Sequence, residues 1–249
     1  MNENMRHYYE VVTQKNMYSN PKNLQFHMNA IFDGTEFSNK QILDIGGGKG
    51  LYTFYSAARG AKHVICLEPE GDGSNDGAHQ LFNDVNQTLN LDNVELQTKT
   101  LQQFEPASTT FDIILMHNSI NHLDEDACEN LKHDPKAQAT YLDLFRRIYD
   151  MAAPGARLIV CDCSRYNAWA FLKLRNPFAP SIEWTKHQSP KLWARLLIQA
   201  GFRTPRTRWS TFNRLGAPGR LLLGNKIMAF FLRSHFCLTM EKPNIESQI

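Results

Sequence analysis

A glycine-rich loop at residues 44–50, Asp-Ile-Gly-Gly-Gly-Lys-Gly, constrains the fold of this 249-residue chain more than any other feature. The loop follows an apolar run at 41–45 that predicts a strand, and a helix-compatible stretch begins at Leu51. Glycine permits positive φ and lets a ligand approach the backbone closely. A strand, a tight glycine turn and a helix N-terminus together predict a nucleotide-binding corner.

The carboxylate of Asp44 restricts which ligand this corner can take. A dinucleotide fingerprint reads G-x-G-x-x-G and places a pyrophosphate at the helix N-terminus. Here the pattern is D-x-G-x-G-x-G, with the third glycine one residue early. A carboxylate beside the loop would repel a pyrophosphate but suits a ligand with a cationic amino-acid end. Glu68 closes the next apolar run, 63–67, where an acid accepts hydrogen bonds from ribose hydroxyls.

Taken together, Asp44, Gly46, Gly48, Gly50 and Glu68 resemble the class I S-adenosylmethionine-dependent methyltransferase family. The resemblance extends from about Lys40 to Gly201 and is weaker in the first forty residues and the C-terminal tail. It implies a Rossmann-like, seven-stranded, mostly parallel sheet with helices on both faces, S-adenosyl-L-methionine as cofactor, and methyltransferase activity.

The resemblance also implies a set of cofactor contacts. Thr100 stands where the family often has an acid that bonds the adenine amino group, and the backbone N–H of Leu101 would reach the ring. Thr100 departs from the usual acid, although its hydroxyl can still accept a hydrogen bond. The implied cofactor-binding residues are Asp44, Gly46, Gly47, Gly48, Gly50, Glu68, Thr100, Leu101, His117 and Asn118.

Strand and helix patterns alternate after residue 40, which is typical of a parallel sheet covered by helices. Ala153-Pro154-Gly155-Ala156 predicts a turn, Ser189-Pro190 a helix start, and Gly201 a helix end. The expected strands are 41–45, 63–67, 93–97, 111–116, 156–162, 205–212 and 233–240, and the expected helices are 50–59, 76–89, 136–152 and 189–200.

We expect a single methyltransferase domain over 1–249, because this length can bury one α/β core. Its parts are an N-terminal lid segment at 1–38, a cofactor-binding core at 40–162, a cap insert at 163–188, and the C-terminal part of the sheet at 189–249. The lid segment could form one or two helices. The cap insert holds Trp169, Phe171, Phe178 and Trp184, which either pack the cap or contact the substrate.

The loop 117–123, His-Asn-Ser-Ile-Asn-His-Leu, follows the fourth strand, where open α/β sheets bind ligands. It is similar to the corresponding loop of small-molecule methyltransferases. It lacks the Asn/Asp-Pro-Pro-Tyr motif of enzymes that methylate flipped bases, which argues against a nucleobase acceptor.

Methyl transfer to a hydroxyl benefits from a general base, and histidine is the natural candidate near neutral pH. His122 and His187 are the catalytic candidates, ranked above His117, and each could instead be a structural histidine. Asp162 is another possible base or substrate ligand. Tyr9 and Tyr18 could close over the methionine end of the cofactor.

Basic residues gather around the cap insert, which indicates either an anionic substrate or a solvated face. They are Lys173, Arg175, Lys186, Arg203, Arg206 and Arg208. A net charge of +2 and a pI near 8.2 are too mild to predict nucleic-acid binding.

Five cysteines in apolar runs predict buried, reduced thiols, and Cys161-Asp162-Cys163 is too tightly spaced for a zinc knuckle, so no metal is expected. The start lacks the apolar core of a signal peptide, and no apolar run is long enough for a membrane span. The nearest, 227–232, predicts a buried strand or helix. We therefore expect a cytoplasmic protein, of undetermined oligomeric state.

The leading hypothesis is methylation of a small molecule at oxygen, on a saccharide, a lipid-like intermediate or a secondary metabolite. A methyltransferase for protein or nucleic acid is the first alternative. A nicotinamide-dependent oxidoreductase is disfavoured by Asp44 and the glycine spacing. A catalytically silent S-adenosylmethionine-binding protein is a further alternative, because the sequence pattern identifies a cofactor site but does not identify a catalytic site.

Overall fold

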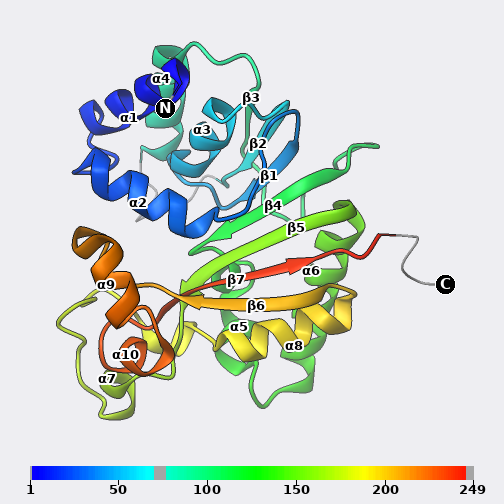
Figure 1. Cartoon of the computed structure of the whole chain (residues 1–249). Coiled ribbons are helices and arrows are strands. Elements are labelled where there is room, and N and C mark those ends of the chain that lie inside the picture. Colours follow the sequence, from blue (N-terminus) through cyan, green and yellow to red (C-terminus); the bar gives the residue numbers. More distant parts are fainter. Residues whose placement is uncertain (1, 70–76, 245–249) are drawn as a thin grey trace. The chain divides into compact units, whose positions relative to one another are not determined.

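The computed structural model describes residues 2–69 and 77–244. Seven strands form one sheet in the order β3-β2-β1-β4-β5-β7-β6 (Figure 1). This confirms the predicted Rossmann-like fold with a mostly parallel sheet. The chain divides into two compact units, Met1–Met116 and His117–Ile249, which are described separately below.

The first unit carries the parallel half of the sheet. Strand β1 pairs in parallel with β2 and β4, and β2 pairs with β3. The register sets Asp44 of β1 beside Cys66 and Leu115, so this carboxylate lies within the sheet core. The strands are β1 (Gln41–Ile45), β2 (His63–Leu67), β3 (Val94–Gln97) and β4 (Phe111–His117), whose last residue belongs to the second unit; helices α3 (Leu51–Ala58) and α4 (Ala78–Leu89) pack against them.

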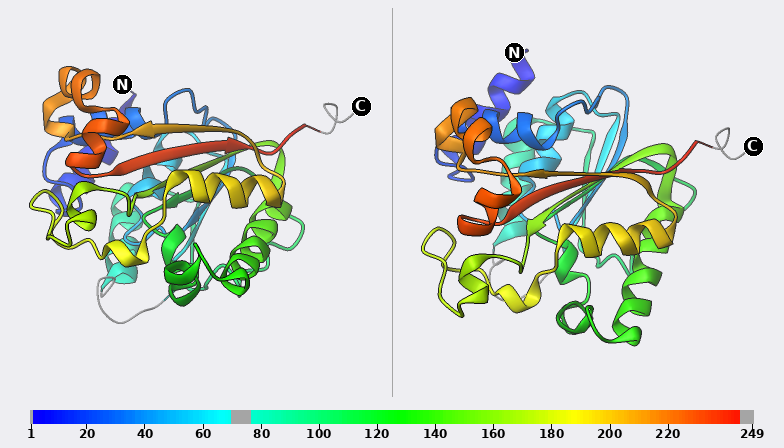
Figure 2. Two further views of the ribbon diagram at one scale, coloured as in Figure 1. Left: turned by 90° about the horizontal axis from the view of Figure 1, so that it is seen from below. Right: turned by 60° about the horizontal axis from the view of Figure 1, so that its bottom comes forward.

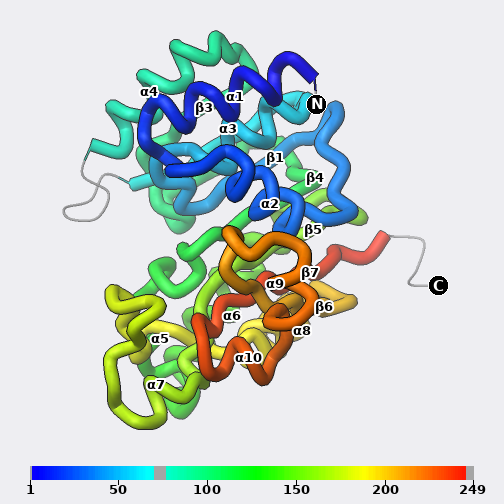
Figure 3. Tube along the Cα trace, turned by 60° about the vertical axis from the view of Figure 1, so that its left-hand side comes forward, coloured from blue at the N-terminus to red at the C-terminus, as the bar shows by residue number. Residues whose placement is uncertain are grey.

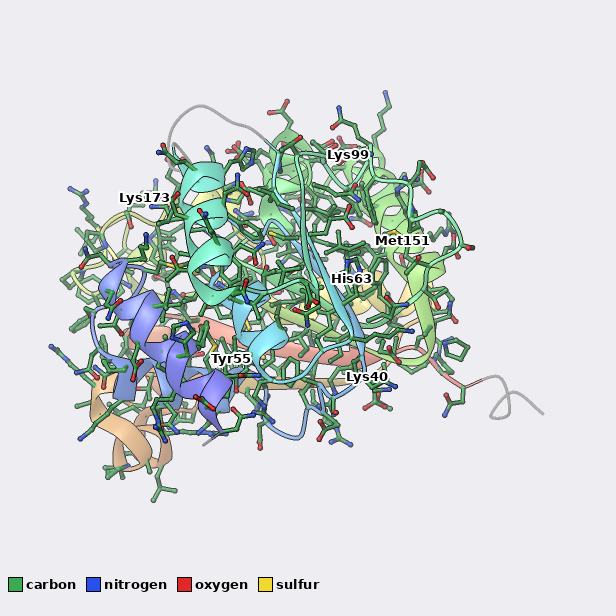
Figure 4. The ribbon with its side chains drawn as sticks, turned by 90° about the horizontal axis from the view of Figure 1, so that it is seen from above. Lys40, Tyr55, His63, Lys99, Met151 and Lys173 are labelled. Atoms are coloured by element: carbon green, nitrogen blue, oxygen red, sulfur yellow. The ribbon has the colours of Figure 1, made fainter. Side chains whose placement is uncertain are left out.

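The first forty residues form two helices, α1 (Glu3–Gln14) and α2 (Pro21–Ile31), within the one or two that the sequence predicts. Helix α1 packs on α3 and α4. Tyr55 of α3, labelled in Figure 4, stacks on Phe32 with 5.2 Å between ring centroids and meets Tyr8 edge-on at 5.7 Å. These buried rings join the N-terminal segment firmly to α3.

The second unit carries the antiparallel part of the sheet. Strand β7 (His235–Glu241) pairs antiparallel with both β5 (Ala152–Cys163) and β6 (Arg203–Trp209). Helices α6 (Pro135–Met151) and α8 (Pro190–Ala200) lie side by side (Figure 2), and the fully buried Trp193 meets Tyr141 at 5.1 Å. Short elements complete this part: η1 (Ile120–His122) and α5 (Glu125–Asn130).

A small helical cap follows β5 and β6 in the second unit (Figure 3). Trp169 Nε1 donates a 2.8 Å hydrogen bond to the carbonyl of Phe231, and Asn176 Nδ2 donates a 2.7 Å bond to the carbonyl of Leu232. These contacts join residues more than fifty positions apart. The cap consists of α7 (Ala168–Phe171), η2 (Trp184–Lys186), η3 (Asn213–Leu215), α9 (Gly216–Leu223) and α10 (Lys226–Phe231).

Helix boundaries around α8 follow the predicted capping signals. Ser189 accepts a hydrogen bond from the Leu192 N–H, and Gly201 ends the helix with φ +119°. The helix predicted at 76–89 appears as α4 from Ala78, and position 76 lies outside the described residues.

Two expectations were wrong. Residues 153–156 do not form a turn; they belong to β5, because the backbone after β7 continues the pairing, with Gly155 N–H bonded to the Lys242 carbonyl at 3.0 Å. The run 227–232 is a helix, as one of its two predicted forms, but it is not buried: Ile227 is 71 % exposed and Phe231 53 % exposed. Nothing in the sequence pattern indicated helix α9 or the exposure of α10. No helix among the described residues is long and apolar enough to cross a membrane.

Candidate cofactor and acceptor site

Asp44 is the last but one residue of β1, and its side chain is buried against α3. Its Oδ2 atom accepts a 2.7 Å hydrogen bond from the Thr53 hydroxyl, whereas Oδ1 is buried without a hydrogen-bond partner. Burial raises the pKa of this carboxyl to about 7, and the nearby charge of Glu68 adds to the rise, while the Thr53 hydrogen bond opposes it. A buried carboxylate oxygen without a partner is costly, so it marks a place for a ligand donor.

The loop after Asp44 bends through three glycines with positive φ: Gly46 at +70°, Gly48 at +56° and Gly50 at +83°. Gly47 sits against the strand, since a Cβ added there would lie 2.5 Å from Cys66 Sγ and 2.8 Å from Asp44 Oδ2. A Cβ on Gly48 would meet nothing within 4 Å. The loop is therefore closed on the side of the sheet and open at Gly48, where a ligand can approach the backbone.

Glu68 lies one residue beyond β2 and is 2 % exposed. Its Oε2 atom accepts a 2.7 Å hydrogen bond from the Gly48 N–H, so the acid at the tip of the second strand braces the glycine loop of the first. His79 of α4 lies 2.9 Å from the Glu68 carbonyl. The predicted ribose acceptor is thus part of the same cluster as the loop.

Thr100 and Leu101 follow β3. The Thr100 hydroxyl accepts a 3.3 Å hydrogen bond from the Gln103 N–H, and the Gln103 side chain accepts a 3.1 Å bond from the Thr100 N–H. Thr100 therefore caps a turn, and Leu101 is buried. The role of both residues toward an adenine ring stays a prediction.

These residues fit S-adenosylmethionine. The orphaned Oδ1 of Asp44 offers an acceptor for an ammonium group, the Gly48 backbone is accessible, and the Glu68 carboxylate stands beside it. A pyrophosphate would meet two carboxylates here, so the donor set favours a ligand with a cationic end.

In the second unit, His117 is the last residue of β4 and Asn118 follows it. Asn118 has φ +55°, and its N–H donates a 2.8 Å hydrogen bond to the Cys161 carbonyl of β5. The buried Tyr141 hydroxyl lies within 3.2 Å of the carbonyls of Ile120, Asn121 and Asp124. The segment after β4 is therefore held against α6 by the Tyr141 hydroxyl.

His187 and Asp162 form a hydrogen-bonded pair. His187 Nδ1 lies 2.9 Å from Asp162 Oδ1, and the Asp162 side chain is fully buried while that of His187 is 13 % exposed. Asp162 Oδ2 is buried without a partner. A carboxylate at Nδ1 fixes the tautomer with the proton on Nδ1, which leaves Nε2 as a proton acceptor.

The segment that carries His187 is anchored on α5. Gln188 Nε2 donates a 2.6 Å hydrogen bond to the Cys128 carbonyl, and Cys128 Sγ lies 3.3 Å from the Lys186 carbonyl. Burial raises the pKa of the Cys128 thiol to about 12, so it is a packing residue here. As predicted, all five cysteines are free and buried.

His122 has a different setting. Its Nδ1 lies 2.6 Å from Glu125 Oε1, its Nε2 lies 3.3 Å from Asn121 Nδ2, and its side chain is 54 % exposed. Lys186 Nζ lies 3.1 Å from the other oxygen of Glu125, and the two partners lower the pKa of that carboxyl. Because both ring nitrogens of His122 have neighbours, His187 is the better placed of the two predicted bases.

A cavity of about 810 Å³ lies wholly within the second unit. It is lined by aromatic and aliphatic side chains of β6, α8 and α10, with Lys191 and Lys226 at its wall. Its residues Ser164 and Ser189 are two positions from Asp162 and His187, respectively.

The cavity shares a face of the sheet with Asp162. The register aligns Asp162 with Phe236 and Phe236 with Trp209, and paired residues of antiparallel strands project to the same face. Trp209 lines the cavity and meets the Phe236 ring at 6.1 Å. Two strand spacings, roughly 10 Å, therefore separate this wall of the cavity from the Asp162 backbone.

Residues 15–205 match the model of a family described as a methyltransferase domain, so the chain belongs to this family. The prediction of a class I S-adenosylmethionine-dependent methyltransferase is confirmed for family, fold and enzyme class. No curated protein matches the sequence.

Several solved structures share the fold. A proposed S-adenosylmethionine-dependent methyltransferase from Listeria monocytogenes is 12 % identical with a TM-score of 0.58, covering 90 % of this chain and 99 % of its own. The cyclase SpnF is 14 % identical with a TM-score of 0.59, covering 89 % and 81 %. The mitomycin 7-O-methyltransferase MmcR is 18 % identical with a TM-score of 0.55, covering 87 % and 52 %. Such low identity shows a common fold and nothing finer.

Sequence reasoning missed several residues of the site. Thr53, the partner of Asp44, is three positions into the helix after the glycine loop, and the chemistry of a buried carboxylate could have suggested it. Asn121 and Glu125 lie one and three positions from His122, which both contact, so their closeness in sequence was a usable signal. Gln188 gave no local signal, because its contact is with the Cys128 carbonyl, sixty positions away.

Proposed function

We propose that this protein transfers a methyl group from S-adenosylmethionine to a hydroxyl of a small-molecule acceptor, with His187 as general base. The observation that carries the proposal is the glycine loop beside Asp44, whose buried Oδ1 has no partner and suits the ammonium end of the cofactor. Asp44, Gly46, Gly47, Gly48, Gly50 and Glu68 would hold the cofactor, with Thr100, Leu101, His117 and Asn118 as further predicted contacts.

The cofactor supplies an activated methyl group, so the chain needs to orient the acceptor and to remove a proton. His187 Nε2 would take the hydroxyl proton, and the Asp162 carboxylate at Nδ1 would stabilise the imidazolium that results. General-base assistance of this kind contributes roughly 10²–10⁴-fold in rate. His122 is the alternative base, bonded to Glu125.

The apolar cavity favours an acceptor with substantial hydrocarbon surface over a saccharide. Its wall holds Trp209, Phe230 and Phe231, with two lysines available for an anionic group. Among the acceptors weighed from the sequence, a lipid-like intermediate or an apolar secondary metabolite suits these walls best. The absence of an Asn/Asp-Pro-Pro-Tyr motif in the loop 117–123 counts against nucleobases.

A second candidate is a protein that binds the cofactor without transferring its methyl group. The cyclase among the structural neighbours has a comparable fold, so fold alone does not decide the reaction. The two candidates differ in one measurable way: only the methyltransferase consumes S-adenosylmethionine.

The test combines binding and turnover. Calorimetric titration with S-adenosylmethionine, S-adenosylhomocysteine and NAD should show binding of the first two only. Cofactor with a labelled methyl group is then incubated with catechol, a long-chain 3-hydroxy fatty acid and glucose as hydroxyl probes. Transfer to catechol or to the fatty acid supports the proposal. Binding of NAD alone would overturn it, and cofactor binding with no labelled product from these probes or from a metabolite extract would favour the silent binder.

A further inference from the structure

The exposed apolar side chains are concentrated in the cap of the second unit. Among the described residues, all large hydrophobic side chains that are exposed lie between positions 166 and 231. Leu221 is 84 % exposed, Phe171 82 %, Ile227 71 % and Leu222 70 %. Isolated exposed apolar residues are ordinary, but a contiguous group of them marks an interaction surface.

The same stretch is strongly basic. Residues 164–234 hold thirteen Lys and Arg but a single acid, Glu183, a net charge of +12 in a chain whose total is +2. The rest of the chain therefore carries −10. Exposed cations of the cap include Lys173, labelled in Figure 4, as well as Arg175, Arg214, Arg220 and Lys226.

Contacts within the cap bring these side chains onto one small structure. Besides the bonds from Trp169 and Asn176 to the end of α10, Phe178 meets the Phe212 ring at 5.5 Å, and the Arg233 guanidinium lies 5.5 Å from the same ring. We use the name cap face for the exposed side chains of residues 171–175, η3–α9 (213–223) and α10 (226–231). Figures 1 and 3 show α10 between α9 and α7 in the second unit.

Helix α10 contributes side chains both to the cap face and to the cavity. Ile227 and Phe231 are exposed on α10 and at the same time line the cavity, with Lys226 beside them. A hydrophobic molecule that meets this face therefore meets the cavity wall through the same helix.

We propose that the cap face docks on an anionic lipid membrane. Apolar side chains on short helices enter the boundary between headgroups and acyl chains, and flanking Lys and Arg attract acidic headgroups. The combination favours lipid over nucleic acid, because the most exposed apolar side chains are leucine, isoleucine and an isolated phenylalanine, not a series of stacking aromatics. It favours lipid over a second copy of this basic surface, which would repel itself. The proposal rests on the cap alone and is independent of the proposed methyl transfer.

Vesicle flotation tests the proposal with the full chain. Phosphatidylcholine vesicles with and without phosphatidylglycerol are mixed with the protein at low and at high salt. The wild-type protein should float with the anionic vesicles, bind neutral vesicles far less, and dissociate as salt rises. Each cation near an anionic surface is worth about a fivefold change in affinity, so K173E/R214E should weaken binding by at least tenfold.

The apolar part is tested by L221D/L222D, whose side chains are already exposed, so the fold should tolerate the change. Ile198→Asp on α8 and Lys136→Glu on α6 are matched controls outside the cap face and should keep vesicle binding. Thermal unfolding confirms that each variant is folded. No flotation of the wild type, equal flotation of L221D/L222D, or binding to single-stranded RNA in place of vesicles would overturn the proposal, as would a wild-type dimer that L221D/L222D converts to a monomer with no vesicle binding by either form.

Discussion

The imidazole of His187 and the carboxylate of Asp162 lie 2.9 Å apart, between a ring nitrogen and a carboxylate oxygen, although the two residues are 25 positions apart in the chain. The acid is at the end of β5 and fully buried, and the histidine is in the segment that leads to α8. The arrangement resembles the orienting half of a catalytic triad in its geometry: the carboxylate fixes the tautomer and leaves Nε2 to act on a proton.

The first prediction concerns this pair. His187→Ala and Asp162→Asn should lower kcat for methyl transfer to a hydroxyl by roughly 10²-fold or more, because one removes the base and the other removes its orienting charge. Cofactor affinity should be little changed, since both residues lie outside the glycine loop. Steady-state kinetics with labelled cofactor and calorimetry of cofactor binding separate the two effects.

His122→Ala is the matched control, because His122 also has a carboxylate neighbour, Glu125, but a mostly exposed side chain. It should retain most of the activity. A larger loss in His122→Ala than in His187→Ala would exchange their roles, and full activity in both would mean that orientation alone suffices.

The second prediction concerns the pH dependence of cofactor binding. The pKa of Asp44 is raised to about 7 by burial, so near pH 6 the carboxyl of the free protein is mostly protonated. An ammonium group at Oδ1 favours the ionised form, so binding should release a proton and affinity should fall as pH drops through 7. Above about pH 8 the amino group of the ligand loses its own charge, so affinity should be greatest between about pH 7 and 8.

Calorimetry at about pH 6 in two buffers with different heats of ionisation measures the released proton directly. Asp44→Asn should bind more weakly and show no proton release. Identical apparent enthalpies in both buffers for the wild-type protein would mean that Asp44 does not ionise on binding.

The third prediction concerns how the Asp44 carboxyl makes the free energy of unfolding depend on pH. In the unfolded chain Asp44 ionises near pH 4, whereas in the folded protein without cofactor it keeps its proton up to about pH 7. Between these values the folded state binds the extra proton, so this group's contribution to the free energy of unfolding falls as pH rises and is lowest above pH 7. Over the whole range, from below pH 4 to above pH 7, the loss is on the order of 4 kcal/mol by linkage.

Asp44→Asn removes this contribution. Urea unfolding at about pH 5 and about pH 8 should therefore show that the substitution raises stability more at the higher pH, by on the order of 3 kcal/mol. The comparison of variant with wild type cancels groups such as Glu125, whose pKa is lowered and whose contribution has the opposite sign. An equal effect of the substitution at both pH values would contradict the raised pKa.

The core of the fold was predictable because its signals are local. The strand at 41–45, the glycine loop and α3 follow one another directly in the sequence, and β1 and β2 match their predicted bounds. The capping signals at Ser189 and Gly201 are local too, and both were confirmed.

The two residues of the proposed general-base pair were predictable only individually. Sequence reasoning named Asp162 and His187 but did not pair them, because their contact depends on Gln188 and Lys186 meeting Cys128 across about sixty residues. The exposure of Ile227 could not be predicted either, since an apolar run normally indicates burial. Its exposure follows from the cap's small size, which leaves one side of α10 uncovered.

The last prediction separates structure from ligand binding within the glycine loop. Gly47→Ala should destabilise the fold, because the new Cβ would overlap Cys66 Sγ and Asp44 Oδ2, and overpacking of this kind costs about 1–3 kcal/mol. Gly48→Ala places its Cβ in open space and should cost only about 1 kcal/mol for a φ of +56°. It should nevertheless weaken S-adenosylmethionine binding strongly, because that open space is where the cofactor would approach the backbone. Thermal unfolding and calorimetric titration of the two variants measure both effects. If Gly48→Ala binds the cofactor as tightly as the wild type, the ligand does not approach the loop at Gly48, and the cofactor contacts proposed for residues 46–50 would be wrong.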